Sequence, residues 1–118
     1  MANSKGPAVK IDYDALEAGI KAAVEAAKEA AQDADDGGTC NFDAAAIFLK
    51  GAREDRVKAA AKAAGVHATK MAGGMWRGSY TLGTPEGGQG NRNTVQAIAM
   101  TKALESAGFE ATTYYQMD

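Results

Sequence analysis

The chain has 118 residues, enough for one domain with a single modest core. Its formal net charge of −2 argues against broad attraction to nucleic acid or to an anionic membrane, and no apolar run approaches the roughly 20 residues of a membrane span. A single cysteine and a single histidine exclude an internal disulfide and a Cys/His zinc site. We therefore expect a cytoplasmic protein with no metal and no cofactor.

Hydrophobic residues make up 46% of the chain, but many of them are alanine, which buries little surface. Such a chain often gains stability by association, so we expect a homo-oligomer. We expect residues 1–11 to form a flexible N-terminal arm and residues 12–118 to form a single α+β domain.

The first predicted helix begins at Asp12 or Asp14, either of which can cap it. It should end by the acidic cluster at 33–36, with Gly37 and Gly38 as its stop. Its apolar stripe packs either on the domain or on another copy of the chain and consists of Leu16, Ile20, Val24, Ala27 and Ala31.

Residues 39–49 alternate at first between polar and apolar side chains and then become continuously apolar, which predicts one long strand that can contain a bulge. Asn41 and Asp43 would point to the same face of it. A helix that begins near Asp43 is the alternative, because three alanines follow.

The rest of the chain alternates between helix and strand: a helix over 53–64 stopped by Gly65, a hairpin of strands 66–71 and 75–82, a Gly-rich loop over 83–92, a helix capped by Asn93 or Thr94, and a strand over 109–117. Without the first helix, this order is βαββαβ. It predicts a ferredoxin-like sandwich, a four-stranded antiparallel sheet with two helices on one face. The extra N-terminal helix either covers the open face of the sheet or mediates a dimer.

The Gly-rich loop before the last helix is the strongest candidate for a ligand site. A helix start offers free backbone N–H groups and partial positive charge, which suit a phosphate or a carboxylate. The predicted anion contacts are Gly88, Gly90, Asn91 and Arg92. The loop lacks the lysine of a Walker A motif and is not a dinucleotide fingerprint, so it favours binding over hydrolysis. We expect no catalytic residues; a nucleotide phosphodiesterase is the alternative.

The hairpin supplies a second candidate. Trp76 and Arg77 can stack on a base and hold its phosphate, although Trp76 or Tyr80 can equally fill a core poor in large residues. Arg77-Gly78-Ser79-Tyr80, together with Phe42, partly matches the pattern of an RNA-recognition module, in which the third strand carries Arg/Lys-Gly followed by aromatics and the first strand supplies another aromatic.

Four further residues complete the predicted ligand site. Asn41 and Asp43 can contact ligand hydroxyls or a base edge, or they can bond to a neighbouring turn. Tyr114 and Tyr115 fall on opposite faces of the last strand, so one should be buried and the other exposed. The exposed one can join a ligand site or an interface.

Three segments together resemble a family of small bacteriophage and prophage proteins: residues 37–43, Gly90-Asn91-Arg92 and residues 114–118. The resemblance covers residues 12–118 and brings no established catalytic residue. It implies a role in countering host defence, either by sequestering a nucleotide-derived signal or by binding a host effector.

Three functional hypotheses follow. The leading one is a non-catalytic protein that holds a small phosphorylated or nucleotide-like ligand. The second is a protein-interaction inhibitor of a host protein that docks through an exposed strand and the first helix. The third is RNA binding through the sheet face, which the acidic net charge disfavours, so we expect nucleic acid to be an unlikely partner.

Overall fold

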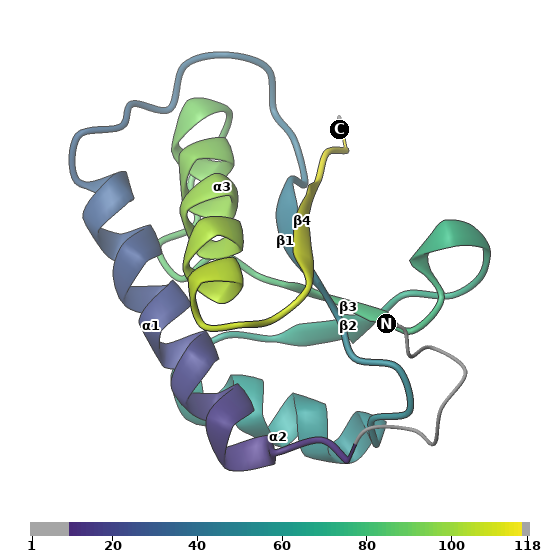
Figure 1. Cartoon of the computed structure of the whole chain (residues 1–118). Helices are drawn as coiled ribbons and strands as arrows, with labels where there is room; N and C mark the ends of the chain where they lie inside the picture. The colour runs from purple at the N-terminus through teal and green to yellow at the C-terminus, as the bar shows by residue number, and fades with distance from the viewer. Residues whose placement is uncertain (1–9, 117–118) are drawn as a thin grey trace.

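The computed structural model describes residues 10–116; most of the predicted arm, residues 1–9, and the last two residues lie outside the described part (Figure 1). Within residues 10–116, the elements follow one another in the order α1 (Tyr13–Ala31), β1 (Ala44–Phe48), α2 (Glu54–Ala64), β2 (Ala68–Lys70), the short 3-10 helix η2 (Gly74–Trp76), β3 (Ser79–Leu82), α3 (Asn91–Ser106) and β4 (Ala111–Tyr114).

The four strands form one antiparallel sheet in the order β2-β3-β1-β4. In the central strand, Ala45 lies opposite Leu82 of β3 and Thr113 of β4. The strand after α1 is therefore central and the last strand lies at an edge, as the βαββαβ order requires. The predicted α+β, ferredoxin-like arrangement with an extra N-terminal helix is confirmed.

Helix α1 starts where the sequence indicates, because the Asp12 carboxylate accepts a hydrogen bond of 3.0 Å from the Ala15 N–H. It ends at Ala31, before the acidic cluster, and Gly37 belongs to a loop that crosses to α3. Its apolar stripe is buried within the molecule, with Leu16 and Ile20 each 0% exposed.

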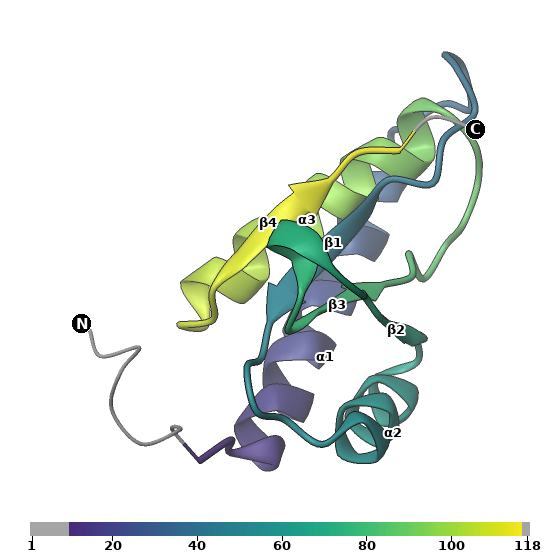
Figure 2. The same cartoon turned by 90° about the vertical axis from the view of Figure 1, so that its right-hand side faces the viewer.

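All three helices lie on one side of the sheet (Figure 2). Helix α1 packs against both α3 and α2 on that side and contributes to their common core. The expectation that α1 covers the open face of the sheet is therefore wrong. The same packing removes its stripe from contact with any other copy of the chain.

The core lies between the helices and one face of the sheet. Alternation in β1 turns Ala45 and Ile47 towards the helices, and the register places Leu82 and Tyr80 beside them. Tyr80 is 2% exposed and thus fills the core, and burial raises the pKa of its hydroxyl. No helix in the described residues is long and apolar enough to cross a membrane.

Two predicted strand starts are wrong. Strand β1 begins at Ala44, and the segment 39–43 keeps only an isolated bridge at Asn41 and one backbone bond from Phe42, because its polar side chains bond to α3. The returning strand of the hairpin begins at Ser79. Trp76 instead lies in η2, whose N-cap Gly73 and first residue Gly74 have φ of 75° and 58°.

Helix α3 begins at Asn91 with Gly90 as its N-cap, ahead of the predicted caps. The side chains of Asn93 and Thr94 are directed to the segment before β1 instead of to their own helix end.

Replacing Ile20 by alanine is predicted to lower the free energy of unfolding by about 2–5 kcal/mol, because it leaves a cavity in the fully buried stripe of α1. Glu29→Ala, at an exposed position of the same helix, should change it by less than about 0.5 kcal/mol. Urea titration measures both. Equal effects would contradict the internal packing of α1.

Candidate functional site

A largely part-buried polar network joins the start of α3 to the segment before β1. The Asn93 amide donates to the Asn41 side-chain oxygen over 2.7 Å and to the Asp43 carbonyl over 3.0 Å. Thr94 Oγ1 accepts from the Asn41 amide over 3.0 Å and donates to the Asp43 carboxylate over 2.8 Å. The other Asp43 oxygen accepts from the Gln116 N–H over 2.8 Å. Asn41 and Asp43 thus lie together, and both make structural hydrogen bonds.

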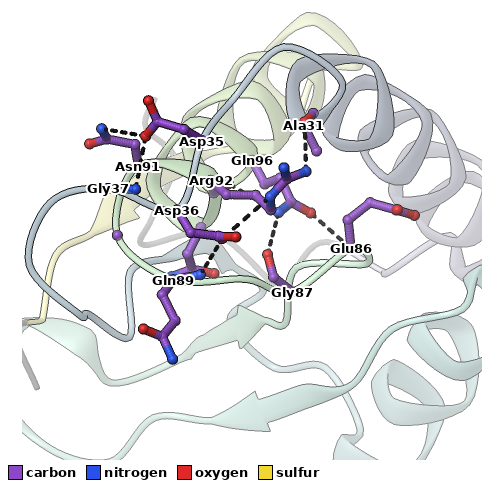
Figure 3. Close-up of polar contacts among 12 residues, drawn as sticks. Ala31, Asp35, Asp36, Gly37, Glu86, Gly87, Gln89, Asn91, Arg92 and Gln96 are labelled. Carbon is purple, nitrogen blue, oxygen red and sulfur yellow. Dashed lines mark hydrogen bonds and ion pairs between the residues drawn. The ribbon is translucent and has the colours of Figure 1, made fainter.

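Arg92 is held by the chain itself (Figure 3). Its guanidinium donates to the Ala31 carbonyl over 2.8 Å, and its Nε lies 3.4 Å from the Asp36 carboxylate. The same Asp36 oxygen accepts from the Gln89 N–H over 3.0 Å. Asp36 therefore occupies the position that the sequence suggested for an external anion.

Gly90 and Asn91 are closely packed against the same crossing loop. The Asn91 N–H donates to the Gly37 carbonyl over 2.8 Å, which satisfies a free donor at the start of α3. A Cβ on Gly90 would lie 2.0 Å from that carbonyl oxygen, and its φ of 53° also favours glycine. We call the contacts of residues 31–37 with 89–92 the loop clasp.

An exposed carboxylate completes the loop clasp. Asp35 accepts from the Gly37 N–H over 2.8 Å and from the Asn91 amide over 3.1 Å. The hydrogen bond from Gly37, and to a lesser degree that from Asn91, holds the pKa of Asp35 below its ordinary value of 3.8. An added phosphate would have to displace this loop to reach the start of α3.

A groove of about 420 Å³ opens on the sheet face that the helices leave bare. Its floor contains Thr69 and Thr81, and its walls come from residues 40–43 and the loop 83–89. Three residues of the predicted site line it, namely Asn41, Asp43 and Gly88. We call it the open-face groove.

Sequence reasoning missed several residues that line the open-face groove: His67, Thr69, Thr81 and Gln89. The period-2 alternation of β2 and β3 places the two threonines on one face, and this signal was available. The pairing of β2 with β3 was needed to put them side by side, and Gln89 reaches the groove through the tertiary course of its loop.

Aromatic side chains gather on the same sheet face beside the groove. The Trp76 ring stacks on Phe48 with centroids 6.1 Å apart and meets the Tyr114 ring edge-on at 4.9 Å. Arg77 follows Trp76 and is exposed. The structure thus brings Trp76 and Tyr114 together, as expected for a shared site, and adds Phe48, which alternation from Phe42 along β1 could have indicated.

Tyr115 lies apart from these residues. It is 64% exposed and lines a shallow groove between α3 and β4, while Tyr114 is half-buried in the aromatic cluster. The expected contrast between the two tyrosines is present, but the exposed one does not face the open-face groove.

The residues lining the open-face groove include neither lysine nor arginine. Apart from the Asp43 carboxylate and the Cys40 thiol, its polar side chains carry hydroxyl, amide and imidazole groups, so the groove suits a neutral polar group with hydrogen-bonding edges. Within residues 10–116, no three His, Cys, Asp or Glu side chains converge as a metal site would need.

Comparison with protein-family models, curated proteins and solved structures finds no match to this chain.

Gly90→Ala is predicted to lower the free energy of unfolding by about 3 kcal/mol or more, because backbone opposes the new methyl group. Gly87→Ala is the matched control: its φ is 60°, but no atom lies within 4 Å of the added Cβ. It should cost only the left-handed strain of about 1–2 kcal/mol. Thermal or urea unfolding measures the difference, and equal costs would argue against the loop clasp.

Acid is predicted to weaken the loop clasp. Because folding lowers the pKa of Asp35, its contribution to stability is complete above pH 3.8 and is lost as the pH falls through the lowered value. Urea titrations between about pH 5 and 2.5 should show a shallower pH dependence for Asp35→Asn than for the native chain. Asp33→Asn, an exposed acid of the same loop, is the control. An unchanged slope in Asp35→Asn would contradict this role.

Proposed function

We propose that this protein binds a small nucleotide-like ligand on the open face of its sheet without turning it over. One observation carries the proposal: the open-face groove, about 420 Å³ in volume, shares its sheet face with the contacting rings of Phe48, Trp76 and Tyr114, and its lining residue Ala44 pairs with Tyr114. Ligand pockets for compounds of this size typically occupy about 300–1,000 Å³.

The chemistry of the groove fits a nucleoside better than a bare anion. Thr69, Thr81 and Gln89 offer hydroxyl and amide groups to base edges or sugar hydroxyls. Phe42 is 59% exposed and also lines the groove, which makes a ring available for base stacking. Arg77 is exposed and directly follows Trp76 of the aromatic cluster. Its guanidinium can bind a phosphate attached to such a nucleoside.

Binding without turnover is favoured by the state of the groove's carboxylate. Both oxygens of Asp43 accept hydrogen bonds, from Thr94 and from the Gln116 N–H. A carboxylate held in this way is a poor general base, because both oxygens are already hydrogen-bonded within the fold and the residue is only 8% exposed.

Arg92, predicted from the sequence to contact an anion, has a structural role in this proposal. It supports the groove wall through Asp36 and Ala31 instead of contacting the ligand. The proposal is compatible with the phage-type role of sequestering a nucleotide-derived signal. A host-protein partner finds less support, because the apolar stripe of α1, one of the two elements expected to dock, is buried in the core.

Calorimetric titration with AMP, cyclic AMP and ADP-ribose tests the proposal. We expect saturable heat with at least one of them and roughly 5- to 150-fold weaker binding in Phe42→Ala, the loss associated with one stacked base. Tyr115→Ala is the matched control, because this ring has similar exposure but lies between α3 and β4. The absence of heat with all three ligands, or equal losses in the two variants, would refute the proposed site.

A further inference from the structure

Four aromatic rings share the open face and follow the course of β1. Phe42 and Phe48 occupy same-face positions six residues apart, and the backbone pairing continues beyond the strand through the Phe42 N–H and the Gln116 carbonyl, 2.7 Å apart. At about 3.3 Å per residue, these two positions are separated by ~20 Å. Tyr114 lies beside Ala44, between them, and Trp76 contacts both Tyr114 and Phe48. We call this row the aromatic track.

Trp76 is fixed in position, although it lies in a turn. Its carbonyl accepts a 2.6 Å hydrogen bond from the Ser79 hydroxyl, and two neighbouring rings contact its indole. Ala46, on the same face of β1 between Ala44 and Phe48, is fully buried, as is Ser79. The side chain of Met75, the residue before Trp76, remains 81% exposed. The turn therefore holds the Trp76 ring in a defined position on the open face.

Positive charge lies at the Phe48 end of the aromatic track. Arg77 and Lys50 are both exposed, and neither forms an ion pair with another of the described residues 10–116. The backbone at Gly78, the residue after Arg77, lies close to Lys50, because a Cβ on Gly78 would be 3.8 Å from the Lys50 Cα. The acidic residue at this end is Glu110, whose carbonyl pairs with Phe48. Two exposed cations therefore lie near this end of the aromatic track.

The separation of the rings decides the length of the ligand. A stacked strand advances about 3.4 Å per nucleotide, so ~20 Å corresponds to roughly six nucleotides, and a mononucleotide reaches only part of the track. The rings lie in a row, Thr81 and Thr112 lie on the strands that flank β1, and the cations lie at one end. This arrangement matches a platform for successive bases and their phosphates. The net charge of −2 describes the whole chain and not this face.

We propose that the aromatic track binds single-stranded nucleic acid, with one end nucleotide in the open-face groove and the following bases stacked towards Trp76. This inference rests on the proposed nucleotide site and extends it from one nucleotide to a chain of several. Recognition is by stacking and charge, so it is expected to tolerate different base sequences.

Trp76 is the only tryptophan of the chain, so its fluorescence reports directly on the track. Titration with dT6 and with rU6 should quench it, and the affinity for each should exceed that for the matching mononucleotide by at least about tenfold, since each added stacked base strengthens binding. The two oligonucleotides distinguish DNA from RNA as the preferred chain.

Two charge variants test the track without disturbing the rings. In Lys50→Ala/Arg77→Ala, the slope of log affinity against log salt should become less steep by about 1.4, the contribution of two phosphate contacts on a single strand. Lys62→Ala, at an exposed position near the end of α2, should leave the slope unchanged. An unchanged slope in the double variant would refute the proposed path of the chain.

The outcomes separate this inference from the function on which it rests. Mononucleotide binding without any gain from dT6 or rU6 would overturn the extended track and leave the nucleotide site intact. Oligonucleotide binding without mononucleotide binding would support the track and overturn the small-ligand proposal. Self-association that Met75→Ser abolishes, seen by sedimentation at rising concentration, would assign the face to a second copy of the chain and overturn the inference.

Discussion

The structure depends on the hydrogen bonds that join the first turn of α3 to the segment before β1. Asn93 and Thr94 satisfy the polar groups of Asn41 and Asp43 in a nearly buried position, where an unpaired group would be costly. This network sets where β1 begins and holds one wall of the open-face groove. The loop clasp fixes the neighbouring backbone, since Gly90 has no room for a side chain beside Gly37.

The small size of alanine explains how three helices fit on one side of the sheet. Ala23 and Ala27 of α1 are fully buried, and such short side chains let helices approach closely. The molecule needs few large core residues as a result. Several of its aromatic rings lie instead on the opposite face, where Phe42 and Trp76 remain accessible. Exposed rings of this kind are informative because burial would otherwise stabilise the fold.

The fate of the Gly-rich loop shows how an anion-binding pattern can serve the fold. The expected ingredients are present, but Asp36 supplies the negative charge and pairs with both Arg92 and the Gln89 N–H. An internal carboxylate reaches this position without the entropy cost of binding a separate molecule. The loop therefore contributes to a ligand site by shaping the groove at Gly88 and Gln89, and the proposed stacking surfaces lie on the sheet.

Local chemistry allowed the sequence to predict the elements and their order. Asp12 caps α1 and Gly65 ends α2 in a left-handed conformation, because both signals act within one turn of the chain. The βαββαβ order then constrains the sheet. Contacts between residues far apart in the chain decided the rest: whether Asn41 lies in a strand, which group pairs with Arg92, and how Trp76 meets Tyr114. These outcomes depend on which partners the packed chain brings within hydrogen-bond or van der Waals reach, and spacing along the sequence carries no such information.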